Sequence, residues 1–75
     1  MKVWEFRVGL HEAHESRSEL FENEAEATEY FTDSAFRMGF SRSQVERYLR
    51  KSHPRGILQK EGGGEWISLD WVSVR

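Results

Sequence analysis

The alternation of apolar and polar positions near the N-terminus predicts a β-strand from Lys2 to His11. Trp4, Phe6, Val8 and Leu10 fall on one side of such a strand. A period of two among β-branched and aromatic residues is typical of a strand with one buried face. We therefore expect these four apolar residues to form one wall of the core.

The segment from Ser18 to Glu22, with the sequence SELFE, has two interpretations. It can be a short second strand that pairs with the first and carries Leu20 and Phe21. It can also be a loop in which Phe21 packs beneath the helix that follows. We favour the strand.

A first helix is predicted from Glu24 to about Met38. Asn23 is a suitable N-cap because its side chain can accept a hydrogen bond from an unpaired backbone N–H. Gly39 supplies the left-handed residue that often follows a helix. The apolar stripe has the three- and four-residue spacing of a buried helix face, and its members are Ala27, Tyr30, Phe31, Ala35 and Met38.

A second helix is predicted from Arg42 to about Lys51. Ser41, followed three residues later by Gln44, is the signature of a capping box. Pro54 prevents the helix from continuing and favours an extended conformation at His53. The predicted buried residues of this helix are Val45, Tyr48 and Leu49.

The last part of the chain predicts a β-hairpin with arms Gly56 to Glu61 and Glu65 to Arg75 around a turn of three glycines. The second arm changes its apolar side: Ile67, Leu69 and Trp71 share one side, and Val72 and Val74 share the other. Either a bulge lies near Asp70 and Trp71, or the strand is covered on both faces.

These elements predict an α+β fold for a single domain, residues 1–75. We expect a small antiparallel sheet, built from the N-terminal strand, the possible second strand and the C-terminal hairpin, with two helices in the order β(β)ααββ. Ten aromatic residues supply apolar area to a chain of only 75 residues.

The net charge of −2 hides two segments of opposite sign. Between Glu12 and Asp33 there are eight acids and one base, Arg17. Between Arg37 and Lys60 there are seven bases and one acid, Glu46. Such a separation can mark an interaction face of one sign. Alternatively, the two segments lie side by side and neutralise each other across ordinary surface.

The composition favours a non-enzymatic, cytoplasmic domain. The chain has no cysteine, and charges at Glu5 and Arg7 interrupt its first apolar segment, which excludes a signal-peptide core or membrane span there. His11 and His14 are expected in an exposed loop rather than in a metal site. We expect no catalytic, cofactor-binding or metal-binding residues and no small-molecule substrate, because the carboxylates belong to a solvated helix face.

The segment from Phe31 to Arg50 resembles a helix-turn-helix of the DNA-binding kind. Ala35, Gly39 and Val45 match its small, turn and β-branched positions, respectively. Residues 55–58, the glycine turn and residues 66–74 look like the hairpin of a winged helix, so the resemblance covers about the last 45 residues.

This resemblance implies that the second helix enters the major groove of double-stranded DNA. The outward positions that would contact base edges are Arg42, Ser43, Glu46, Arg47 and Arg50. Cations that would contact phosphates are Lys51, Arg55 and Lys60. The sequence departs from the resemblance in the acidity of the first helix and in having a strand where a third helix is usual.

Three alternatives stay open at this point. The spacing of Ala35, Gly39 and Val45 also occurs in a generic corner between two helices. The domain can instead bind a protein partner, through its acidic helix or an apolar patch around Trp66, Val72 and Val74. It can also bind a second copy of itself by pairing of edge strands.

Overall fold

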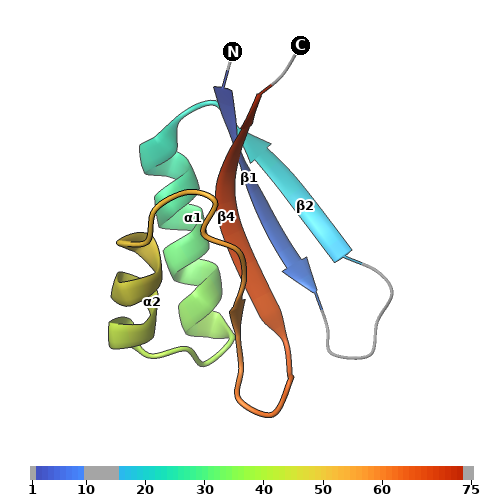
Figure 1. The fold of residues 1–75 in the computed structure, drawn as a ribbon, viewed down its shortest axis with the longest axis vertical. Coiled ribbons are helices and arrows are strands. Elements are labelled where there is room, and N and C mark those ends of the chain that lie inside the picture. The colour runs from blue at the N-terminus through green and yellow to red at the C-terminus, as the bar shows by residue number, and fades with distance from the viewer. Residues whose placement is uncertain (1, 10–15, 74–75) are drawn as a thin grey trace.

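The fold is a four-stranded antiparallel sheet with two helices, seen in a computed structural model that describes residues 2–9 and 16–73. The elements, in chain order, are β1 (Lys2–Gly9), β2 (Ser16–Phe21), α1 (Glu24–Arg37), α2 (Arg42–Leu49), β3 (Leu58–Gln59) and β4 (Trp66–Ser73). The strands are ordered β2-β1-β4-β3, and α1 and α2 lie together beside the sheet (Figure 1). The predicted α+β class and element order, including the second strand, are confirmed.

The long central strands β1 and β4 pair without interruption, from Lys2 opposite Ser73 to Gly9 opposite Trp66. This continuous register excludes a bulge at Asp70 and Trp71. Ile67, Leu69 and Trp71 face the helices, whereas Val72 lies opposite Val3 on the other face of the sheet. Leu10, for which we predicted a buried position, and Val74, which shares the side of Val72, lie outside the described residues.

The core lies between one face of the sheet and the two helices. Its buried members are Phe6, Ala27, Phe31, Ala35, Phe40, Val45, Tyr48, Ile67 and Leu69. Trp4 and Val8 are half-buried against this cluster, as the alternation near the N-terminus predicts. Tyr30 departs from the predicted stripe: it is 38% exposed and lies at the rim, with its ring 5.0 Å from that of Phe6.

The first helix begins and ends through the residues that the sequence indicates. The side chain of Asn23 accepts a hydrogen bond from the Glu26 N–H at 3.1 Å. After Met38, Gly39 has a φ of 94°, which a residue with a Cβ rarely adopts. The N–H of Phe40 then bonds the carbonyl of Ala35, so Phe40 turns back into the core.

The second helix has the predicted capping box. The N–H of Gln44 donates to Ser41 Oγ at 3.2 Å, and the N–H of Ser41 donates to Gln44 Oε1 at 2.8 Å. α2 ends at Leu49, two residues before the predicted end. The chain then turns and brings residues 53–56 alongside β4. There the Tyr48 hydroxyl donates a hydrogen bond to the Gly56 carbonyl, and the Asp70 carboxylate accepts one from the Arg55 N–H.

On the face of the sheet away from the helices, the indole of Trp66 lies over Gly9, where a Cβ would be only 2.3 Å from the ring. The guanidinium of Arg7 lies 5.6 Å from the centre of that indole. Trp66 is thus half-buried by its neighbours on the sheet rather than standing free. Within the described residues, neither helix has the length and apolar character needed to span a bilayer.

Candidate nucleic-acid interface

The second helix, α2, is fixed to the sheet by one buried tyrosine. The Tyr48 ring stacks on Phe31 with centroids 4.9 Å apart. Its hydroxyl accepts a hydrogen bond from the Leu69 N–H at 2.9 Å and donates one to the Gly56 carbonyl at 2.7 Å. Burial raises the pKa of Tyr48 to about 12, so the hydroxyl stays protonated at neutral pH and can donate. The outward face of α2 therefore has a defined orientation.

Arg55, predicted to reach a phosphate, instead joins the end of α2 to β4. Its guanidinium donates to the carbonyls of Leu69 and Leu49, each at 3.2 Å, and to that of Lys51 at 3.4 Å. Its charge also lies 5.8 Å from the Tyr48 ring centre. The Leu49 carbonyl is one that the end of a helix leaves unpaired, whereas the Leu69 carbonyl belongs to β4. Arg55 is half-buried and is not part of an outward cationic surface.

Asp70 holds the segment that follows α2. Its carboxylate accepts hydrogen bonds from the backbone N–H groups of Arg55 at 2.8 Å and Gly56 at 3.2 Å. His53 Nδ1 lies 2.6 Å from Asp70 Oδ1, and its ring is 5.2 Å from that of Trp4. His53 is thus more than a turn residue, because it packs on the sheet and contacts a carboxylate.

At the beginning of α2, Arg42 and Glu46 form an ion pair, with Nε 3.1 Å from Oε1. Both side chains are largely in solvent, so the pair contributes little to stability and can be exchanged for other partners. Ser43 is exposed beside them. These three residues form the outward surface of the first two turns.

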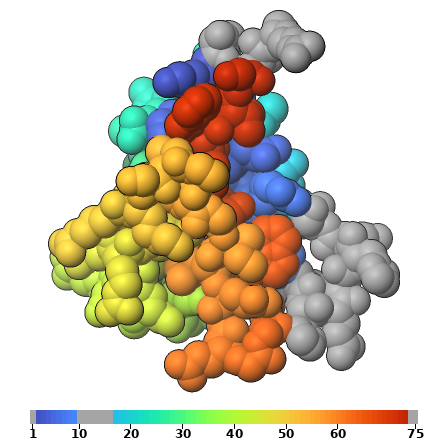
Figure 2. Space-filling view, in the orientation of Figure 1, coloured from blue at the N-terminus to red at the C-terminus, as the bar shows by residue number. Residues whose placement is uncertain are grey.

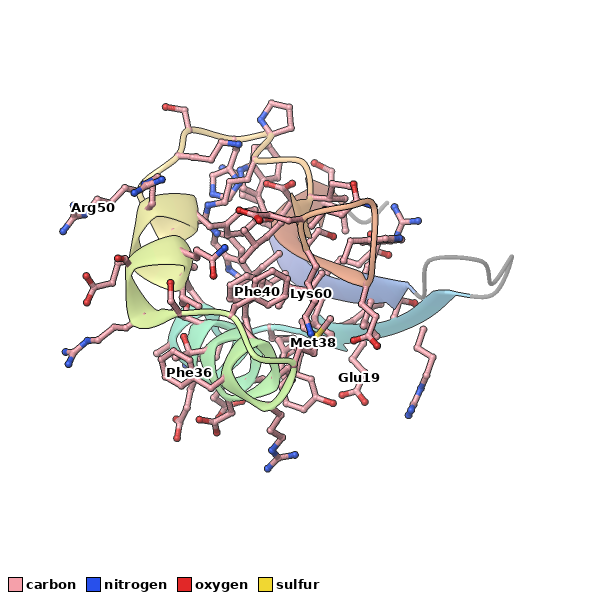
Figure 3. The ribbon with its side chains drawn as sticks, turned by 90° about the horizontal axis from the view of Figure 1, so that it is seen from below. Glu19, Phe36, Met38, Phe40, Arg50 and Lys60 are labelled. Atoms are coloured by element: carbon pink, nitrogen blue, oxygen red, sulfur yellow. The ribbon has the colours of Figure 1, made fainter. Side chains whose placement is uncertain are left out.

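The end of α2 and the two residues that follow it carry three cations: Arg47 in the last turn, and Arg50 and Lys51 just beyond it. All three are exposed, and none forms an ion pair with a carboxylate of residues 2–9 or 16–73. Figure 3 shows Arg50 pointing away from the body of the molecule. Because like charges here are close and uncompensated, this end of α2 is a local positive surface.

A shallow groove of about 200 Å³ separates α2 from the segment that leads into β3. Arg47 and Lys51, one helical turn apart, line its α2 side, and Ile57 and Leu58 line the other. Ile57 is half exposed. Figure 2 shows the yellow surface of α2 adjoining the orange surface of the β3–β4 hairpin on this face.

Lys60, another of the three predicted phosphate contacts, folds back onto the corner between the helices. Its ammonium lies 5.9 Å from the centre of the Phe40 ring, and Figure 3 shows it beside Met38 and Phe40. It is half-buried. Of the eight predicted contact residues, four lie on α2 and two, Arg50 and Lys51, follow its end directly, whereas Arg55 and Lys60 point elsewhere.

Among residues 2–9 and 16–73, the acids of α1 form no ion pair with the cations at the end of α2. Among the described residues, neither ion pair involves a carboxylate of α1, and the four acids of that helix are exposed: Glu24, Glu26, Glu29 and Asp33. The expectation that the two charged segments cancel by direct pairing is therefore not met by any contact between these helices.

Sequence reasoning missed the contacts made by Tyr48, His53, Arg55 and Asp70. One signal for them is present in the chain: Asp70 is a lone acid in the apolar segment Ile67 to Val74, and a half-buried carboxylate needs hydrogen-bond donors. No signal in the sequence identifies those donors, because they come from a loop.

Within the described ranges, no three His, Cys, Asp or Glu side chains gather as metal ligands; His11 and His14 lie outside those ranges. Comparison of the chain with protein-family models, curated proteins and solved structures finds no match. Function must therefore be argued from the geometry and charge of this molecule.

Proposed function

We propose that this protein is a non-enzymatic binding domain that binds double-stranded DNA through α2. The observation that carries the proposal is the group of exposed cations at and just beyond the end of α2, Arg47, Arg50 and Lys51, without carboxylate partners in the described parts of the chain. Cations on a fixed helix can neutralise phosphates with little loss of conformational freedom in the helix itself.

The two ends of α2 have different roles in this proposal. Its beginning presents Arg42, Ser43 and Glu46, whose polar groups suit base edges: arginine donates to guanine and glutamate accepts from cytosine. Its last turn and the two residues after it present Arg47, Arg50 and Lys51 to the phosphates, so that Arg47 and Arg50 join Lys51 there instead of contacting base edges. The groove beside Ile57 gives one backbone strand a place to lie between Arg47 and the β3 segment.

The exposed ion pair between Arg42 and Glu46 supports this division. Both partners stay within reach of solvent, so exchanging the pair for base contacts costs little. We expect that Glu46→Gln tightens binding to random duplex, because it removes a negative charge from the surface that meets the negatively charged duplex, and that it weakens any preference for cytosine at the contacted position.

The test is a fluorescence-anisotropy titration of a labelled random duplex at two salt concentrations. We expect the triple variant Arg47→Ala, Arg50→Ala, Lys51→Ala to lose most of the binding at low salt. The slope of log K against log salt should fall by up to about 2.7, or about 0.9 for each phosphate that the variant no longer neutralises.

A variant with the same loss of charge elsewhere is the matched control: Lys2→Ala, Arg7→Ala, Arg37→Ala. It should bind nearly as the unaltered protein does. Equal losses in both triple variants would mean that only net charge matters and would overturn the assignment to α2. An unaltered protein that binds no duplex at low salt would overturn DNA binding itself and leave the exposed acids of α1 as the next interaction surface to test.

A further inference from the structure

The strand β2 has a strand neighbour on one side only. It pairs with β1 over six residues, from Trp4 opposite Phe21 to Gly9 opposite Ser16, and no described strand pairs with its other edge. Proteins usually protect such an edge with proline, lysine, a bulge or a very short strand. β2, with the sequence SRSELF, has none of these, and its charged side chains, which also discourage pairing with a strand of like charge, are one of each sign: Arg17 and Glu19.

The side chains of β2 add an apolar and a charged feature to this edge. Leu20 is 62% exposed on the face away from the helices, opposite Glu5. Arg17 and Glu19 lie on the helix-covered face, opposite Val8 and Phe6, and both are exposed. The Tyr30 hydroxyl donates to Glu19 Oε1 at 3.2 Å and holds that carboxylate on the helix side.

The charge order along β2 is complementary to itself. When two copies of a strand pair antiparallel about a two-fold axis, residues equally distant from the axis on opposite sides face each other, with side chains on the same face. An axis at Ser18 places Arg17 of each copy opposite Glu19 of the other. An axis at Glu19 would place glutamate opposite glutamate, and one at Arg17 would place arginine opposite arginine.

We propose that two copies of this protein associate through antiparallel β2–β2 pairing centred on Ser18. The association extends the sheet to eight strands, satisfies backbone groups at both β2 edges and forms two cross-strand ion pairs between Arg17 and Glu19. The register is chosen by charge, since the neighbouring two-fold registers oppose like charges. This association uses β2 and is independent of DNA binding by α2.

Charge exchange provides the test, with association measured by sedimentation velocity across a concentration series. The unaltered protein should show a concentration-dependent dimer. Arg17→Glu or Glu19→Arg alone should weaken dimerisation at least about tenfold, because each puts two pairs of like charges opposite each other. An equimolar mixture of the two single variants should form heterodimers, and the double variant Arg17→Glu, Glu19→Arg should dimerise again.

The matched control is Glu29→Arg, which makes the same charge change on α1, away from β2. It should dimerise as the unaltered protein does. Circular dichroism melting of each variant separates unfolding from dissociation, and the mixture and the double variant test the register even if one single variant is unstable. A monomer at every concentration of the unaltered protein, or single variants that dimerise equally well, would overturn the proposal.

Discussion

The hydroxyl of Tyr48 accepts a hydrogen bond from the backbone N–H of Leu69 at 2.9 Å. Leu69 lies on the part of β4 that has no β3 partner, since β3 pairs only with Trp66 and Ile67. The side chain of a helix thus takes the position that the carbonyl of a neighbouring strand would occupy. The same hydroxyl donates to Gly56, so one group connects α2, β4 and the loop between α2 and β3.

The variant Tyr48→Phe should lower the free energy of unfolding by about 1–3 kcal/mol at neutral pH. The phenylalanine ring keeps the stacking on Phe31 but leaves the N–H of Leu69 and the carbonyl of Gly56 without this partner in a buried place. Urea unfolding followed by tryptophan fluorescence measures the loss. A stability equal to that of the unaltered protein would show that water replaces the hydroxyl without cost.

Stability should also fall at alkaline pH because of the same tyrosine. The pKa of Tyr48 in the folded protein, about 12, lies above its ordinary value of 10.0. The neutral hydroxyl therefore stabilises the fold fully below pH 10, and this contribution is lost as the pH rises through 12. Unfolding curves at pH 8 to 12 should show a smaller decline for Tyr48→Phe than for the unaltered protein.

Tyr30→Phe is the control for this pH dependence. Burial and the hydrogen bond to Glu19 also raise the pKa of Tyr30, so its titration adds to the alkaline decline. If Tyr30→Phe removes the whole alkaline decline in stability and Tyr48→Phe leaves that decline unchanged, the role assigned to Tyr48 is wrong.

Arg55→Met should destabilise the protein without changing the salt dependence of DNA binding. The methionine fills part of the space but cannot donate to the carbonyls of Leu49 and Leu69. A reduction of about 1–3 kcal/mol in the free energy of unfolding is expected from these unpaired acceptors. Chemical denaturation measures the first effect and the duplex titration the second. If the slope of log K against log salt became shallower and stability did not change, Arg55 would instead be a phosphate contact.

Gly9→Ala should disturb the packing of Trp66. A Cβ at this position would lie 2.3 Å from the indole, so either the ring moves or the strands separate. We expect a destabilisation of about 1–3 kcal/mol, as for other overpacked sites, and a red shift of tryptophan emission. The double variant Gly9→Ala, Trp66→Leu should recover part of the stability; no recovery would place the strain elsewhere.

The cap of α2 can be tested against a neighbouring serine. Ser41→Ala removes the acceptor for the Gln44 N–H and should cost about 0.5–2 kcal/mol. Ser43→Ala, two residues later on the exposed surface, leaves both bonds of the capping box in place and should change stability little. Thermal melting of both variants distinguishes the capping contact from a general effect of losing a hydroxyl.

The beginnings of both helices and the end of α1 were predictable because local chemistry specifies them. Asn23, Gly39 and Ser41 each act through residues no more than a few positions away, and their contacts are those that the sequence indicates. The continuous pairing of β1 with β4 was not predictable. The alternation of apolar and polar residues in β4 shows which side chains share a face, but it does not determine which residues of β1 lie opposite them. The bulge considered near Asp70 resulted from that ambiguity.

The candidate site was predictable only in part. The count of bases after Arg37 identifies α2 as cationic, but a count does not show which charges already have partners. Arg55 and Arg47 count equally as bases of the same segment, but their surroundings differ. The path of residues 50–56 directs Arg55 towards backbone carbonyls, whereas Arg47 stays exposed. That path depends on Asp70, which lies 15 positions from Arg55 in the sequence.

Lys2 and Ser73 are paired neighbours in the sheet, so the polypeptide enters and leaves this structure at one place. A short linker across that point would allow circular permutation, with new ends opened in the glycine turn between Gly62 and Gly63. The same arrangement suits the domain for insertion into a surface loop of a host protein, because the two points of attachment need to be only about one strand spacing apart.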